Sequence, residues 1–221
     1  LHVLLFSDNV SLTTERQLKE FAVSKNLLLM GPDCGTAIIN GIPLAFANAV
    51  RRGKIGIVSA SGTGLQEVSS VIHNCGEGIS QAFGTGGRDG KKEIGGLMLL
   101  FCLEYLMRDP NTEVLVLLSK VPDTEVVEKI WQLLESVQKP VVINFLQPFS
   151  PPKNPYLYMA DTLAETAYKA CRLLNDKILP AKEGKELKLE TLFTNRTLVT
   201  LPVKPTRRYL RGLFSGGTLC Y

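Results

Sequence analysis

The sequence has little histidine and no paired cysteines, and each shortage excludes a class of protein. Only two histidines occur among 221 residues, His2 and His73, and neither stands in a metal-ligand pattern. We therefore predict no metal site. The five cysteines are scattered and form no Cys-x-x-Cys pair, which is typical of reduced thiols in a cytoplasmic protein.

Long apolar runs and a strong excess of one charge are also absent. The longest apolar run, residues 96–103, is far shorter than the roughly 18 residues that span a bilayer. The 25 Lys+Arg and 21 Asp+Glu give a net charge of +4, and no basic and aromatic stripe accompanies it. We therefore expect neither a membrane nor a nucleic acid as partner. A hydrophobic share of 45% and a charged share of 21% indicate a globular protein.

The first 50 residues resemble the end of a larger α/β unit. Residues 1–6 form an apolar run, a helix capped by Thr13 or Thr14 is predicted to end near Ser24, and residues 27–30 form a second apolar run. The sequence starts inside a predicted strand and ends just after a glycine pair, so we expect a fragment of a longer protein.

From residue 53 the pattern becomes regular. Strands are predicted at 55–58, 79–83, 114–118 and 141–145, and helices at 63–74, 97–108, 123–137 and 160–174. Alternating strands and helices predict one doubly wound α/β domain over residues 53–175, with a mainly parallel sheet. Residues 176–206 are predicted to be a linker, and residues 207–221 to begin a further domain.

The best candidate site lies between the first predicted strand and helix of this domain, in Ser59-Ala60-Ser61-Gly62-Thr63-Gly64. Glycines allow close backbone approach, and a helix N-terminus offers free N–H groups to an anion. Ser61, Gly62 and Thr63 are therefore predicted to bind an anionic group. The alternative is structural, because Thr63 and Gln66 fit a capping box. Neither the P-loop nor the Rossmann glycine spacing is present.

Two further loops follow predicted strands and are expected at the same edge of the sheet. The first of these loops is Gly84-Thr85-Gly86-Gly87-Arg88-Asp89. Arg88 could bind a carboxylate or phosphate through its planar guanidinium group, or the loop could be a flexible turn with no ligand. In Gly31-Pro32-Asp33-Cys34-Gly35-Thr36, Cys34 could be a nucleophile, but the pattern favours a buried, unreactive thiol.

Taken together in this order, the three loops resemble the α-subunit of succinyl-CoA synthetase and the NDP-forming acyl-CoA synthetases. The resemblance covers residues 1 to about 174. It implies the C-terminal part of a Rossmann-like CoA-binding domain over residues 1–50 and a flavodoxin-like CoA-ligase domain over residues 53–175. Within this superfamily the stretches Phe6-Ser-Asp-Asn-Val10, Pro43-Leu-Ala-Phe-Ala-Asn48 and Gly212-Leu-Phe-Ser-Gly-Gly-Thr-Leu219 are most similar to the FdrA family.

The resemblance implies a subunit of an acyl-CoA or carbamoyl-transferring enzyme, with oxamate carbamoyl transfer in allantoin and purine breakdown as the FdrA-type activity. It implies CoA, phosphate or carbamoyl phosphate as ligands, a hetero-complex or other oligomer, and catalytic roles for Glu67 and Arg88. Gly86 and Gly87 would contact the anion with Ser61, Gly62 and Thr63. The alternative is a non-catalytic anion-binding or CoA-binding regulatory subunit.

The sequence departs from that superfamily at two places. The synthetases pass phosphate through a histidine that follows the fourth strand of the ligase domain, whereas residues 145–160 here contain none. The family's asparagine in Gly-Pro-Asn-Cys is Asp33 here. Glu67 matches the acid that holds the phosphohistidine in the synthetases, and with no histidine to hold, Glu67 has no evident role of that kind here.

Overall fold

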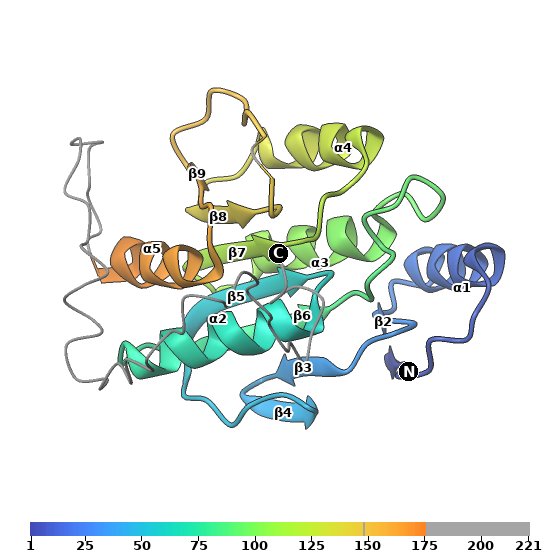
Figure 1. Ribbon diagram of the computed structural model, residues 1–221, viewed down its shortest axis with the longest axis horizontal. Coiled ribbons are helices and arrows are strands. Elements are labelled where there is room, and N and C mark those ends of the chain that lie inside the picture. The colour runs from blue at the N-terminus through green and yellow to red at the C-terminus, as the bar shows by residue number, and fades with distance from the viewer. Residues whose placement is uncertain (148, 176–221) are drawn as a thin grey trace, which may run out of the picture.

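The computed structural model describes residues 1–147 and 149–175, which form two sheets and five helices. The linker and further domain predicted for residues 176–221 lie outside this range. The first unit comprises β1 (Val3–Leu4), α1 (Leu12–Ser24) and β2 (Leu29–Met30), and β1 pairs with β2 in parallel. Figure 1 shows this unit at one side of the larger sheet.

The strand–helix–strand unit was predicted, but its helix begins earlier than expected. Ser11, not Thr13 or Thr14, caps α1, because the Ser11 Oγ accepts a hydrogen bond from the Thr14 backbone N–H at 3.1 Å. A serine in extended conformation just before a helix satisfies one of the N–H groups that lack an intrahelical partner.

The larger sheet has seven strands in the order β4-β3-β6-β5-β7-β8-β9. Its parallel strands are β5 (Arg52–Ser59), β6 (Ile79–Gly84), β7 (Val114–Leu118), β8 (Val141–Asn144) and β9 (Leu157–Met159). Numbered from β5, these strands run 2-1-3-4-5 across the sheet, which is the flavodoxin-like order. The predicted α/β fold class is therefore confirmed.

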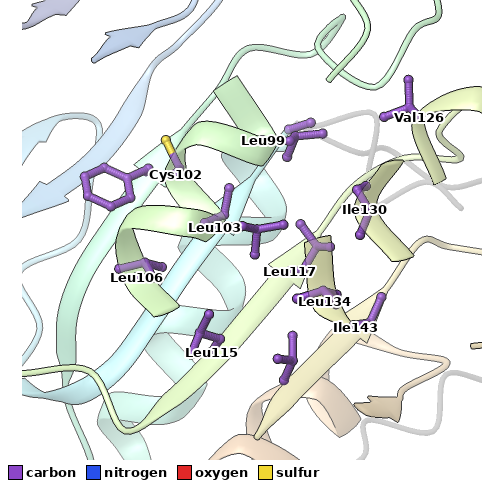
Figure 2. Packing of buried hydrophobic residues seen from close by; sticks show 14 of the residues in the cluster. Leu99, Cys102, Leu103, Leu106, Leu115, Leu117, Val126, Ile130, Leu134 and Ile143 are labelled. Atoms are coloured by element: carbon purple, nitrogen blue, oxygen red, sulfur yellow. The ribbon is translucent and has the colours of Figure 1, made fainter. Parts of the chain in front are cut away.

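Helices cover both faces of this sheet. The helices are α2 (Gly62–Asn74), α3 (Leu97–Arg108), α4 (Thr124–Leu134) and α5 (Leu163–Asn175). Helices α2 and α5 pack together over one face, where alternate β7 residues such as Val116 contact them. On the other face, α3 and α4 enclose Leu115 and Leu117 of β7, as Figure 2 shows. Buried on both sides, β7 is apolar at every position.

A hairpin that was not predicted completes one edge of the sheet. β3 (Thr36–Ile39) and β4 (Ile42–Ala45) pair antiparallel around Asn40-Gly41, where both turn residues have positive φ, 52° and 79°. Asn-Gly is the preferred pair for a two-residue hairpin turn of this kind. Because β3 also pairs with β6, residues 36–45 share a sheet with residues 53–175.

Two smaller features concern the lengths of the helices. In the part of the chain that the structure describes, no helix is both long and apolar enough to cross a bilayer. Helix α5 begins at Leu163 rather than at residue 160, because the Thr162 Oγ1 caps it by accepting from the Glu165 N–H at 3.1 Å.

Candidate functional site

Three parallel strands end level with one another at the carboxyl edge of the sheet. Ser59 at the end of β5 pairs with Gly84 of β6 on one side and with Leu118 of β7 on the other. The chain leaves β5 toward β6 and reaches β7 on the opposite side of β5, so the strand order reverses between β5 and β7. Ligands of open α/β sheets bind in the crevice at such a point.

A cavity of about 290 Å³ lies at this edge. Ser61, Gly62, Thr63, Gly86 and Gly87, the five residues predicted to contact the anion, all line it. The prediction that the loops after β5 and β6 meet at one edge is therefore confirmed. The loop between β2 and β3 closes the cavity from the side of β6 and supplies Asp33, Cys34 and Gly35.

The start of α2 differs from the expected capping box. Ser61 is the N-cap residue, with an extended backbone at φ −136°, and its Oγ accepts from the Gly64 N–H at 3.0 Å. Gln66 makes no capping contact; its Nε2 donates to the Thr36 Oγ1 at 2.8 Å. Gly62 and Thr63 thus occupy the first two helical positions, whose N–H groups have no acceptor within the helix.

Gly86 holds the second loop against the third. Its φ is +90°, and a Cβ at this position would stand 2.1 Å from the Pro32 carbonyl oxygen. Only glycine fits a left-handed backbone that lies this close to another chain segment. The cavity wall formed by Gly86 and Gly87 therefore depends on direct packing of the β6–α3 loop on the β2–β3 loop.

The structure places the two predicted catalytic residues elsewhere. Arg88 points to the first unit, where its Nη2 lies 2.7 Å from the Glu15 Oε2 and donates to the Val10 carbonyl at 2.7 Å. Glu67 is exposed on α2. Neither residue is among those that line the cavity.

Arg88 borders a buried ionic cluster formed by Lys19, Glu15 and Asp89, whose side chains are fully buried. The Lys19 ammonium donates to the Glu15 Oε1 at 2.9 Å, the Thr85 carbonyl at 2.9 Å and the Asp89 Oδ1 at 2.7 Å. Burial raises the pKa of Asp89, and Lys19 opposes that rise. The cluster joins α1 to the loop that carries Gly86 and Gly87.

Sequence reasoning missed Lys120 and an aromatic pair in the cavity, and it named Asp33 without giving that residue a role. Lys120 follows β7 after Ser119, and Asp33 precedes Cys34; both line the cavity. Phe6 and Phe46 lie at its rim with ring centroids 5.5 Å apart in an edge-to-face arrangement. Lys120 could have been found by applying the carboxyl-edge rule to every strand rather than to glycine-rich loops alone.

The thiol of Cys34 matches the unreactive alternative. The residue is 2% exposed, and its Sγ donates to the Thr36 carbonyl at 3.6 Å. Burial is the main cause that raises the pKa of Cys34, which disfavours the reactive thiolate.

Both histidines lie away from this cavity. His2 Nδ1 accepts from the Leu28 N–H, and His73 Nδ1 accepts from the Arg51 N–H, each at 3.0 Å. His2 lines a different cavity of about 780 Å³, formed largely by apolar residues of the first unit, the β3–β4 hairpin, β6 and α3. The cavity at the carboxyl edge therefore has no imidazole among the described residues that line it.

Comparison with known proteins relates the chain to CoA ligases. Residues 50–146 match the family model described as the CoA binding domain. This match falls on the segment that the sequence predicts to be a CoA-ligase domain, rather than on the first 50 residues.

The curated relatives are longer than this chain. It is 49% identical to the uncharacterized protein YahF of Escherichia coli (strain K12), over the whole chain and 42% of that protein. It is 28% identical to the α-subunit of an ADP-forming succinate–CoA ligase of Aquifex aeolicus, over 68% of the chain and 50% of the relative. A malate–CoA ligase α-subunit of Methylorubrum extorquens is also 28% identical, over 63% of the chain and 46% of the relative. The chain thus spans half or less of the length of these relatives.

Among solved structures, the ATP citrate lyase of Methanothrix soehngenii in complex with citrate and coenzyme A matches with a TM-score of 0.60. The alignment covers 99% of this chain and 43% of that one at 18% identity, so it supports the fold alone. The chain is therefore similar to succinate–CoA ligase α-subunits and carries a match to the CoA binding domain.

Proposed function

We propose that this chain is part of an FdrA-type, succinyl-CoA-synthetase-like enzyme that binds the anionic group of a small substrate in the cavity at the carboxyl edge. The observation that carries the proposal is the convergence of the loops after β5, β6 and β7 on one cavity at the point where the strand order reverses. The N–H groups at the start of α2 and the cation of Lys120 would hold the anion. The similarity to CoA ligases supports an acyl or carbamoyl group as the part transferred.

The size of the cavity fits the small substrate better than CoA. A volume of about 290 Å³ is at the lower limit of ligand pockets in proteins. It suits a phosphate, a carbamoyl phosphate or a small acid, whereas CoA carries a nucleotide and a long pantetheine arm. CoA, which the family match supports, would therefore make most of its contacts outside this cavity. We propose a cytoplasmic hetero-complex as the working form, in line with relatives that are named as subunits.

The first prediction concerns the start of α2. Gly62 is exposed, and a Cβ there would approach only the Thr36 Oγ1, at 3.5 Å, so Gly62→Val should fold normally. Its branched side chain would occupy the space in front of the first-turn N–H groups. We expect at least a tenfold loss of affinity for inorganic phosphate, measured by calorimetry on the full chain. Glu128→Val on the exposed face of α4 is the control, and equal affinities of the two variants would contradict the assignment.

The second prediction concerns phosphate transfer. A phosphohistidine relay needs an imidazole nitrogen at the phosphate site. The residues that line the cavity include no histidine, and the Nδ1 atoms of His2 and His73 accept backbone hydrogen bonds elsewhere. Incubation of the chain with labelled ATP or GTP should leave no acid-labile label, while a phosphohistidine-forming enzyme in the same assay becomes labelled. Acid-labile label on this chain would contradict the prediction and support an ordinary acyl-CoA synthetase mechanism.

A second candidate function is a non-catalytic subunit that retains the anion cavity for regulation. The absence of an imidazole from the residues lining the cavity favours it. Carbamoyl or acyl transfer assayed with the full-length protein and its partner subunits separates the two. Loss of turnover in the Gly62→Val variant supports the enzyme, whereas unchanged turnover with lost phosphate binding supports the regulatory subunit.

A further inference from the structure

The C-terminal ends of α2 and α5 lie together on one face of the sheet. Each helix follows a parallel strand, α2 after β5 and α5 after β9, so both run back along that face in the same direction. The two helices pack against each other (Figure 1). Cys75 is the C-cap residue of α2, and Cys171 lies about one turn before the end of α5. The packing of the helices therefore brings these two cysteines to the same end of the layer.

A hydrogen bond fixes the register of the two helix ends. The Asn175 Nδ2 donates to the Glu77 Oε1 at 3.0 Å, just beyond the last turn of α2. Asn175 and Cys171 are four residues apart, so they share a face of α5 and are separated by roughly 6 Å along its axis. Cys75 precedes Glu77 by two residues and stands beside Cys171. The side chains of the two cysteines are in hydrogen-bond contact with each other.

The two thiols differ in their exposure to solvent. Cys75 is the one exposed cysteine in the part of the chain that the structure describes. Cys171 is 7% exposed and belongs to the hydrophobic cluster that includes Ile72 and Ala167. Burial and, second, the neighbouring charge of a Cys75 thiolate raise the pKa of Cys171 to about 12, so Cys171 stays a thiol at neutral pH. An oxidant in solution therefore reaches Cys75 first.

We propose that Cys75 and Cys171 form a reversible redox site, at which a low-molecular-weight disulfide such as glutathione disulfide oxidises the pair to an intramolecular disulfide. In the first step the Cys75 thiolate attacks one sulfur of glutathione disulfide, whose S–S bond breaks; a mixed disulfide forms and one glutathione leaves. In the second step the Cys171 sulfur loses its proton and attacks the Cys75 sulfur, which releases the second glutathione. The two thiols lose two protons and two electrons, and glutathione disulfide takes up both.

The second step should be the slower one. Only a thiolate attacks a disulfide, and the raised pKa of Cys171 keeps few of these side chains ionised at neutral pH. Formation of the mixed disulfide removes the charge of Cys75, which is one of the causes that raise the pKa of Cys171, so the first step makes the second easier. The mixed disulfide should therefore appear first and then give way to the intramolecular disulfide.

Oxidation of the folded full chain with glutathione disulfide tests the proposal. Peptide mapping by mass spectrometry without reductant should show a linked pair of peptides that contain Cys75 and Cys171. The Cys171→Ala variant should stop at the mixed disulfide on Cys75, and the Cys75→Ser variant should give neither product. Cys102→Ala is the matched control, because Cys102 is buried on the other face of the sheet, and it should form the same cross-link as the unmodified chain.

The cross-link should also change the thermal transition. It joins positions that are far apart in the sequence and so restricts the unfolded chain. We expect the oxidised chain to unfold about 5 °C or more above the reduced chain, with the shift reversed by dithiothreitol and absent from the Cys75→Ser variant.

Three results would overturn the redox site. They are no reaction at Cys75, a mixed disulfide on Cys75 that persists in the unmodified chain, and a link from either cysteine to a different one. A cross-link that formed equally well in urea would also overturn it, because the pairing would then owe nothing to the packing of α2 on α5. Phosphate plays no part in these measurements, and the pair lies at the end of α2 opposite to Ser61, so the result is independent of the proposed anion site.

Discussion

Lys19→Met is expected to lower the free energy of unfolding by about 3–5 kcal/mol, as does the removal of one partner from other buried ion pairs. Methionine fills a similar volume but supplies no charge, so the fully buried carboxylates of Glu15 and Asp89 lose their shared cation. The Thr85 carbonyl loses its donor as well. Urea denaturation of the full chain at pH 7 measures the effect.

The destabilisation should depend on pH in a defined direction. The pKa of Asp89 is raised in the folded protein by burial, and loss of Lys19 removes the main opposing cause. A group with a raised pKa binds its proton more tightly when folded, so the stability it contributes is present at low pH and is lost as the pH rises. The difference between Lys19→Met and the unmodified chain should therefore shrink as the pH falls from 7 toward 5.

Lys54→Met is the matched control for this variant. Lys54 pairs with Glu113 at the surface, where its side chain is 57% exposed. Exposed pairs contribute at most about 1 kcal/mol, so the control should stay close to the unmodified chain. Equal losses in the two variants would mean that water reaches the Lys19 cluster and that it does not hold α1 against the larger sheet.

Local patterns predicted the elements that are strongly apolar. Residues 97–108 form a helix as predicted, and the strand at 114–118 also matches, because the helix buries an apolar stripe at helical spacing and the strand is buried at every position. The β3–β4 hairpin was missed although Asn40-Gly41 is a strong turn signal between two short apolar runs. β9 was missed because it follows a proline-rich loop and is only half buried.

The glycine-rich loops could be placed at one edge from sequence, because parallel strands share a carboxyl edge. The direction in which the Arg88 side chain points could not be predicted from sequence. It depends on how α1 packs against the β6–α3 loop, which brings Glu15 next to Arg88. The contact between Arg88 and Glu15 joins residues far apart in the chain and has no local signature in the sequence. Lys120, by contrast, lies just beyond a predicted strand, and the same edge rule would have placed this cation among the described residues that line the cavity.

Gly86→Ala is expected to lower the free energy of unfolding by about 3 kcal/mol. A left-handed backbone costs a residue with a Cβ roughly 1–2 kcal/mol. The added carbon would also stand 2.1 Å from the Pro32 carbonyl oxygen, and such overpacking typically costs about 1–3 kcal/mol more. Because backbone rather than a flexible side chain blocks the Cβ, the β6–α3 and β2–β3 loops must separate. Urea denaturation of the full chain provides the measurement.

Gly87→Ala, one residue further, distinguishes loop packing from a general effect of alanine in this loop. Its Cβ would meet only the Asp33 Oδ2, at 3.0 Å, and that carboxylate can rotate away. Stability should change by less than about 0.5 kcal/mol, as at most surface positions. If Gly86→Ala proved as stable as Gly87→Ala, the two loops would not be held together, and the cavity wall on which the ligand proposals depend would not be rigid.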